Sequence, residues 1–402
     1  MRSAALSHLR VLDLSRVLAG PWATQALADL GAEVIKVERP GTGDETRGWG
    51  PPWLRGAGDG ARESAYFAST NRGKRSVTID LSRPEGQALV RRLAARADVL
   101  VENHKVGALA RRGLGYEDLA ALNPRLVYCS ISGFGQSGPY RDRPGYDFLV
   151  QAMGGLMSIT GEPGGPPMKV GVALTDLLTG MYAATAVLAA LAERDRSGRG
   201  QHVDLALLDV QVAALANQAE AFLVTGRSPG RLGNAHPSIV PYQAFRASDG
   251  HVVVAVGNDG QFARLAEVVG RPELAADARF ATNAARVEHR EELVAVLASA
   301  LATRTTDEWV RALDAADVPA GPINDLAQVF DDPQVRHRGL RIDLPRAGGD
   351  PVPVVASPIR LSRTPVEHRP PPRLGEHTRE VLVEVLGMDD AEVEALRGAG
   401  VI

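Results

Sequence analysis

Positively charged side chains gather in loops at the ends of expected β-strands, where they could bind phosphate groups. Arg39 follows the apolar run Val34–Val37, so it would lie just past a strand, the usual position of a nucleotide contact. Two further loops combine cations with amide side chains, which suits charge-assisted hydrogen bonds to phosphate oxygens. The first loop contains Asn71, Lys74 and Arg75, and the second contains Asn103, His104, Lys105 and Arg111.

One short segment, Gly226-Arg227-Ser228-Pro229-Gly230, matches the Gly-x-Ser-x-Gly motif of serine hydrolases. In those enzymes the backbone N–H after the serine helps to stabilise the oxyanion. Pro229 has no N–H, and no helix is expected to follow it. We therefore interpret the segment as a loop between domains.

Other common catalytic and phosphate-binding motifs are missing from the sequence. The first strand-to-helix turn reads Leu18-Ala19-Gly20-Pro21 in place of Gly-x-Gly-x-x-Gly, and there is no Walker A sequence. The nine histidines are scattered and Cys129 is the single cysteine, so we expect no metal site and no disulfide. Because Cys129 falls within an expected strand, we interpret it as a buried, inert thiol.

Alternating apolar strands and helices predict a doubly wound α/β domain. The chain opens with a β-α-β unit, in which Gly20 and Pro21 begin the helix and Gly31 can end it. This unit has expected strands 9–14 and 34–37 around helix 22–30, and the next has strands 76–81, 99–101 and 126–131 with helices 84–96 and 117–122. We expect these strands to form one parallel sheet.

The second half of the chain predicts a smaller α+β domain. A long helix 176–194, a strand 202–206 and a helix 207–224 precede the Gly/Pro-rich loop 226–234, which is the best domain boundary. Beyond it we expect a strand at 252–256, helices at 261–269, 290–302 and 306–316, an extended stretch 351–372 and a helix 380–397. The expected organisation is a large domain 1–225, a small domain 226–330, and a linker 331–402 that returns to the large domain.

Composition limits the classes of function. The 402 residues are 45% hydrophobic and 23% charged with a net charge of −3, which excludes widespread disorder and offers no basic field for nucleic acid. The longest apolar run, Met181–Ala192, is expected to be too short to cross a bilayer, and the N-terminus shows no signal-peptide pattern. We expect a cytosolic enzyme with no membrane and no nucleic-acid partner.

Six segments of the chain, in the order in which the family has them, make it similar to the class III (formyl-CoA transferase-like, CaiB/BaiF) CoA-transferase family over residues 8 to 365. The resemblance implies a Rossmann-like large domain with a parallel sheet, a smaller α+β domain and an interlocked homodimer. It also implies acyl-CoA and small carboxylic acids as substrates, with coenzyme A as co-substrate and no other cofactor. The segments are VLDLSRVLAGP (11–21), GAEVIKVERPGTGDETRGWGPP (31–52), NRGKRSVTIDL (71–81), DVLVENHKVGALARRGLGY (98–116), SGFGQSGPY (132–140) and GVALTDLLTGMYA (171–183).

Within that family the chain resembles most the transferases that use succinyl-CoA and a dicarboxylate such as glutarate or hydroxymethylglutarate. The segments HPSIVPYQAF (236–245) and VAVGNDGQF (254–262) carry this finer similarity. In the family an aspartate after the Gly-Val-Ala segment is the nucleophile, which implies that Asp176 carries CoA as an aspartyl thioester. From the residues alone, the favoured interpretation of Asp176 is a helix N-cap, and the nucleophile role comes from the resemblance.

Tyr146 distinguishes the family's transferases from its α-methylacyl-CoA racemases. The racemases have a histidine at this position for proton abstraction, whereas a tyrosine is a poor general base at neutral pH. The resemblance therefore favours a transferase, with a racemase, a transferase for formate or another acid, and a non-catalytic CoA-binding protein as alternatives. Leu18 stands where formyl-CoA transferases have glutamine, which weakens an oxalate assignment.

The resemblance also assigns the remaining site residues. Backbone groups of Val17, Leu18 and Ala19 would pass beside the pantetheine arm, and a loop with Gly257 and Gly260 would cover the active site. A second carboxylate on the acceptor would need cations or hydrogen-bond donors. Our candidates for it are Arg47 beside Trp49, together with His236, Ser238 and Tyr242.

Overall fold

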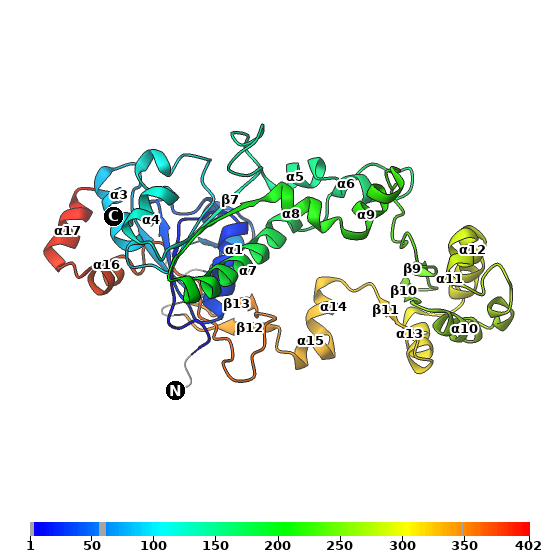
Figure 1. Cartoon of the computed structure of the whole chain (residues 1–402). Helices are drawn as coiled ribbons and strands as arrows, with labels where there is room; N and C mark the ends of the chain where they lie inside the picture. Colours follow the sequence, from blue (N-terminus) through cyan, green and yellow to red (C-terminus); the bar gives the residue numbers. More distant parts are fainter. Residues whose placement is uncertain (1–3, 56–61, 347–348) are drawn as a thin grey trace. The chain divides into compact units, whose positions relative to one another are not determined.

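The computed structural model describes residues 4–55, 62–346 and 349–402 and divides into two compact units (Figure 1). The large unit comprises Met1–Leu156, Val170–Ala219 and Gln334–Ile402, and the small unit comprises Met157–Lys169 and Glu220–Pro333. The segment 157–169 therefore belongs to the small unit, although it was expected within the large domain. The loop 226–234 holds it there, because Arg231 donates to the Gly165 carbonyl and the Gly233 N–H to the Gly161 carbonyl, at 2.6 and 2.9 Å.

A six-stranded sheet forms the centre of the large unit, and all five of its strand pairings are parallel. The strand order is β5-β2-β1-β6-β7-β8, which is the order of a Rossmann fold. This confirms the expected α/β class. The chain order reverses between β1 and β6, so the crevice beyond their carboxyl ends is the expected ligand site. The strands are β1 (Arg10–Asp13), β2 (Glu33–Glu38), β5 (Lys74–Thr78), β6 (Val99–Glu102), β7 (Val127–Ser132) and β8 (His202–Ala206).

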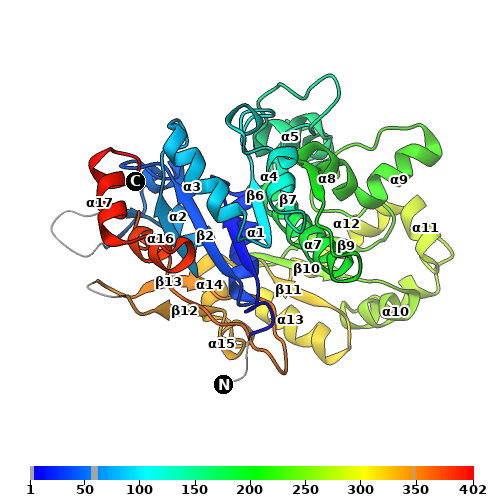
Figure 2. The same ribbon diagram turned by 60° about the vertical axis from the view of Figure 1, so that its left-hand side comes forward.

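Each face of this sheet packs against its own set of helices, as Figure 2 shows. Successive strand side chains point to opposite faces, so Val11 packs in one core and Leu12 in the other. Cys129 is fully buried in the Val11 core, as expected, and burial raises the pKa of its thiol to about 12. The Val11 core includes α1 (Ala19–Asp29), α5 (Asp147–Met153), α7 (Leu174–Ser197) and α8 (Leu207–Ala214), and the Leu12 core includes α3 (Pro84–Ala94), α4 (Tyr116–Leu122), α16 (Thr378–Leu386) and α17 (Asp390–Gly398).

Two sequence expectations about helices were wrong. The helix expected at 207–224 is two helices, α8 and α9 (Ala216–Thr225), bent by 76° where Ala216 adopts a positive φ of 45°. The run Met181–Ala192 lies in α7, whose 24 residues are long and apolar enough to cross a membrane. The inner face of α7 nevertheless packs on the sheet through Ala183 and Val187, so we interpret it as a core helix.

The small unit is an α+β structure, as expected, with an antiparallel sheet in the order β11-β10-β9. Trp309 is the largest side chain of its core and donates its indole N–H to the Leu301 carbonyl at 2.7 Å. Its elements are β9 (Tyr242–Arg246), β10 (His251–Ala255), β11 (Ala320–Pro322), α6 (Leu156–Ile159), α10 (Asp259–Val268), η3 (Pro272–Ala275), α11 (Asn283–Glu288), α12 (Arg290–Leu301), α13 (Thr306–Ala315) and α14 (Leu326–Asp331).

Shorter elements complete the large unit. A hairpin of β12 and β13 occupies part of the stretch that was expected to be extended from 351 to 372. These elements are η1 (Glu45–Gly48), β3 (Trp53–Arg55), β4 (Arg62–Ser64), α2 (Ala65–Thr70), η2 (Ala110–Arg112), α15 (Pro333–His337), β12 (Arg341–Leu344) and β13 (Val352–Val355).

Candidate active site

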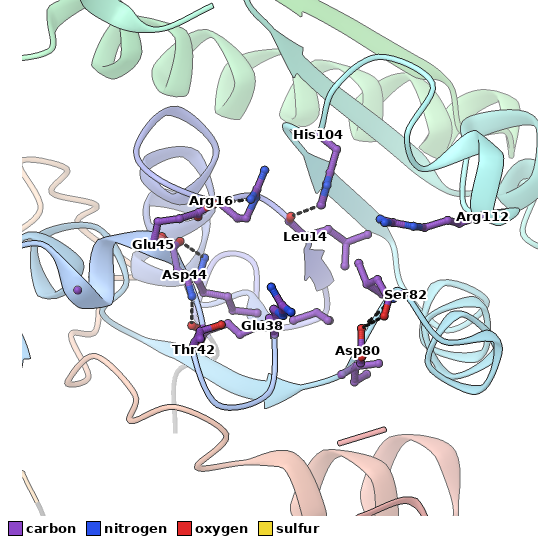
Figure 3. Close-up of a pocket in the computed structure, with 17 residues that line it drawn as sticks. Leu14, Arg16, Glu38, Thr42, Asp44, Glu45, Asp80, Ser82, His104 and Arg112 are labelled. Carbon is purple, nitrogen blue, oxygen red and sulfur yellow. Dashed lines mark hydrogen bonds and ion pairs between the residues drawn. The ribbon is translucent and has the colours of Figure 1, made fainter. Parts of the chain in front are cut away.

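Two neighbouring cavities lie beyond the carboxyl ends of β1 and β6, where the strand order reverses. The larger has a volume of about 810 Å³, and its walls include Arg16, Arg39 and Arg112. Figure 3 shows His104 and Arg112 entering this cavity from different segments of the chain. The smaller has a volume of about 330 Å³ and contains Asp176. Arg16, Glu45 and His104 line both cavities, so one ligand could extend from the arginines to Asp176.

Asp176 lies in the first turn of α7 but does not cap that helix. The cap comes from Asp147 on α5, whose Oδ1 accepts hydrogen bonds from the N–H groups of Thr175 and Asp176 at 2.8 and 3.2 Å. Gln151 holds the other oxygen of Asp147 by donating to it at 2.6 Å. Asp147 therefore accepts the hydrogen bonds of the free N–H groups at the start of α7, and the Asp176 carboxylate remains available to the cavity.

Burial raises the pKa of Asp176 to about 7, and the nearby charge of Asp147 raises it further in the same direction. A carboxyl group with such a shift, inside a cavity, is typical of a functional site. The same two carboxylates affect Tyr66 on α2. Burial and the charges of Asp176 and Asp147 raise the pKa of its phenol to about 12. Its phenol therefore stays protonated near the carboxylate, and its ring packs edge-on against Trp49 at 5.1 Å.

The start of α1 forms the wall of the smaller cavity next to Asp176. Gly180 explains the close approach, because a Cβ atom there would lie 2.7 Å from the Ala19 carbonyl oxygen. Asp176 and Gly180 are one turn apart on the same face of α7, so the Asp176 side chain faces the beginning of α1. Leu18 and Ala19 line the cavity, and no described residue accepts a hydrogen bond from either backbone N–H. These two donors are available to a ligand.

The structure brings several of the predicted residues together in this cavity. Val17, Leu18 and Ala19 form one wall, and Asn103 and His104 form another. Tyr146 lines the same cavity as Asp176 from the N-terminal end of α5, with 67% of its surface exposed.

Asn103 and His104 were expected to contact phosphate, but their side chains bind the protein. The Asn103 amide accepts from the Arg16 N–H at 2.8 Å and donates to the Arg16 carbonyl at 2.7 Å, which joins the loops after β1 and β6. The His104 ring contacts the Leu14 carbonyl at 3.2 Å. Burial, with the charges of Arg16 and Arg112, lowers the pKa of His104 to about 4, so it is neutral. In this structure His104 therefore contributes no positive charge to the cavity.

Of the arginines predicted to bind phosphate, Arg39 lines the larger cavity and Arg111 does not. Arg39 is exposed and lines the cavity just past β2, where the sequence placed it. Arg111 is exposed on η2, but the neighbouring Arg112 lines the cavity instead. Since η2 is a 3₁₀-helix with three residues per turn, adjacent side chains point in different directions.

The expected cationic loop at 71–75 is not an exposed loop. Lys74 lies at the start of β5 and is fully buried, donating to Asp13 at 3.0 Å and to the Asn71 side chain at 2.8 Å. Arg75 pairs with carboxylates on β2 and α16, namely Glu33 and Glu380 at 2.5 Å each and Glu384 at 2.8 Å. These side chains stabilise the sheet, and none of the three lines either cavity.

Arg47 was the candidate for binding a second carboxylate, but it is engaged within the protein. Its guanidinium forms two hydrogen bonds of 2.7 Å with Glu38 and stacks 3.7 Å above the Phe67 ring. Neither Arg47 nor Trp49 lines the cavity of Asp176. Instead, Lys105, Arg141 and Arg143 line it, and the two arginines were not singled out from the sequence.

The remaining predicted residues belong to the small unit. His236, Ser238 and Tyr242 lie together, since the His236 ring is 5.4 Å from the Tyr242 ring and accepts from the Ser238 N–H at 3.1 Å. Gly257 precedes Asn258, which caps α10, and Gly260 lies in the first turn of that helix. Neither glycine has a positive φ, so the backbone conformation does not require them. Among the described residues, no group of three or more His, Cys, Asp or Glu could hold a metal ion.

The chain belongs to CoA-transferase family III, whose model matches residues 6–378. It is 54% identical to a succinate–glutarate CoA-transferase of Agrobacterium fabrum, with 96% of each chain covered. The human succinyl-CoA:glutarate CoA-transferase is 44% identical, covering 99% of this chain and 90% of the human protein. A crystal structure of a CAIB/BAIF family protein from Brucella suis has a TM-score of 0.83 at 50% identity, covering 94% of this chain and 98% of that one.

Proposed function

We propose that this enzyme transfers CoA from succinyl-CoA to glutarate and that Asp176 carries the CoA as a covalent thioester. The observation that supports the proposal most is the uncapped Asp176 carboxylate in a cavity at the switch point of the sheet. The similar proteins of Agrobacterium fabrum and human are named for succinate and glutarate, which supports this pair of acids.

The chemistry begins with attack of the Asp176 carboxylate on the succinyl-CoA thioester carbon. The C–S bond breaks, which gives a succinyl–aspartyl anhydride and the CoA thiolate. The thiolate attacks the aspartyl carbonyl, releasing succinate and leaving aspartyl-CoA. Glutarate then attacks the aspartyl thioester, which breaks its C–S bond and gives a glutaryl–aspartyl anhydride and the CoA thiolate. The thiolate attacks the glutaryl carbonyl, which gives glutaryl-CoA and restores the Asp176 carboxylate. No proton is gained or lost overall, and the energy of the thioester is kept.

The cavity contains groups suited to the charges that develop in these steps. Each attack places negative charge on a carbonyl oxygen, and the N–H groups of Leu18 and Ala19 are donors on the wall that faces Asp176. For the distal carboxylate of the dicarboxylate we propose Lys105, Arg141 and Arg143, since their cationic side chains line the same cavity. The arginines of the larger cavity, Arg16, Arg39 and Arg112, suit the phosphates of CoA.

A homodimer is part of the proposal. The large unit exposes many apolar side chains on α5, α7 and α8, including Phe148 at 58% and Tyr182 at 50% exposure. Such a surface is typical of a region that a second subunit covers.

The proposal is tested by peptide mass mapping after incubation with succinyl-CoA and no acceptor, quenched in acid. We expect a CoA-sized adduct on the peptide that contains Asp176, absent from Asp176→Ala and retained by Asp195→Ala, an exposed aspartate on the same helix. Added glutarate should discharge the adduct as glutaryl-CoA. Exchange of the α-proton for solvent deuterium without adduct would support the racemase alternative, although Tyr146 occupies the position of the racemases' histidine.

A further inference from the structure

Val17 has an unusual backbone conformation at the wall of the active-site cavity. Its φ of 69° lies in the left-handed region, which a β-branched residue rarely adopts. Such a conformation is unfavourable for valine and persists only when the surroundings enforce it. Because Leu18 and Ala19 follow directly, the backbone at Val17 decides where their N–H groups point.

A buried carboxylate holds the Val17 backbone. The Val17 N–H donates to both oxygens of Asp44, at 3.3 Å each. Asp44 is itself held by the Lys36 ammonium, which donates to its Oδ2 at 2.9 Å and to the Ser15 carbonyl at 2.9 Å. The side chains of Lys36 and Asp44 are both fully buried. A single ion pair therefore contacts the backbone on both sides of Arg16.

The flanking residues are restrained as well. The Asn103 amide binds both backbone groups of Arg16, which precedes Val17. On the other side, Gly20 packs on Ser15 so closely that a Cβ atom at Gly20 would lie 2.3 Å from the serine side chain. The turn between β1 and α1 is thus restrained before and after Val17, and Asp44 binds the strained residue itself.

We propose that Asp44, held by Lys36, is a positioning residue that keeps Val17 left-handed and thereby aims the N–H groups of Leu18 and Ala19 at the oxyanion formed on attack by Asp176. This rests on the proposed function. Asp44 has no contact with the reacting atoms, and it acts through the backbone. Loss of an aligned oxyanion donor typically reduces a rate by about 10²–10³-fold, so partial misalignment should cost about 10- to 100-fold.

The test compares Asp44→Asn in two backgrounds, native and Val17→Gly, by the single-turnover rate of adduct formation on Asp176 with succinyl-CoA. In the native background we expect the rate at saturating succinyl-CoA to fall about 10- to 100-fold, because valine leaves the left-handed region once its anchor weakens. Glycine adopts this conformation without strain. In the Val17→Gly background the same Asp44→Asn change should therefore lower the rate less than about 3-fold.

Asp29→Asn is the matched control, because it weakens another buried ion pair, with Arg72, at the far end of α1. It should lower the melting temperature without changing the adduct rate. Equal losses from Asp44→Asn in both backgrounds, or no loss in either, would overturn the proposal. If the wild-type enzyme itself forms no adduct while hydrolysing or exchanging the donor, the proposed function fails instead.

Discussion

Replacing Asp147 with asparagine should shift the pH dependence of the nucleophile without removing its helix cap. The asparagine Oδ1 can still accept from the N–H groups of Thr175 and Asp176, but the negative charge is lost. The pKa of Asp176 is raised from 3.8 to about 7, with burial as the larger cause and Asp147 as the smaller. We therefore expect Asp147→Asn to lower that pKa by about one, equivalent to about 1.4 kcal/mol.

The assay is the single-turnover rate of adduct formation on Asp176 between pH 5 and 9. The rate should rise with pH, because only the ionised carboxylate attacks. With a pKa of about 7 roughly a tenth of Asp176 is ionised at pH 6, and with a pKa of about 6 roughly a half. At pH 6 the variant should therefore reach about a five-fold larger fraction of its own plateau rate than the wild type. Asp389→Asn, at the N-cap of α17, should leave the profile unchanged. An acidic limb that stays within ~0.3 pH units of wild type in Asp147→Asn would refute the reasoning.

The remaining predictions concern Asp176, Lys74, Arg39 and Gly180. Because the folded-state pKa of Asp176 lies above its unfolded value, its ionisation destabilises the fold as pH rises from about 4 to 7, so Asp176→Asn should raise the melting temperature at pH 8 and lose this advantage near pH 4. Lys74→Met should lower the free energy of unfolding by about 3–5 kcal/mol, because it leaves the buried Asp13 carboxylate without its ion-pair partner, and KM for succinyl-CoA should not change. Arg39→Ala should instead raise this KM and leave the melting temperature unchanged. Gly180→Ala should slow adduct formation at least about 10-fold, because its Cβ forces the start of α1 away from Asp176; an unchanged rate in stopped-flow or quench measurements would contradict the close packing.

The hydrophobic pattern was sufficient to predict the strands and most helices of the large unit. Alternation and apolar runs report burial directly, so 9–14, 34–37 and 126–131 match β1, β2 and β7 within a few residues. The break at Ala216 was missed because it depends on a positive φ in an alanine, which no sequence signal marks. The hydrophobic pattern also could not predict the order of the strands in the sheet, since that order depends on pairing between strands far apart in the sequence.

The candidate site was predictable to the extent that its residues follow strands in the chain. Leu18, Ala19 and Arg39 lie near cavities because the carboxyl ends of parallel strands meet at one edge. Lys74 was predicted to bind phosphate because a lysine at the start of a strand is usually exposed. Its burial depends on an ion pair with Asp13, which is 61 residues away in the sequence. Asp147 was not recognised as the cap of α7, since that contact joins residues 29 positions apart.

The last residues of the chain complete the first part of the fold, which constrains biosynthesis. The Asp80 N–H donates to the Val401 carbonyl at 2.8 Å, and Val381, Leu382 and Val401 belong to the same core as Leu12. At about 5–20 residues per second, the ribosome needs roughly 15 to 65 s to travel from residue 80 to residue 401. During that interval the Leu12 core has α3 and α4 but lacks the contributions of α16, α17 and Val401. Nascent chains of this enzyme should therefore engage chaperones until residue 401 has been synthesised, and a stop codon before α16 should yield aggregates.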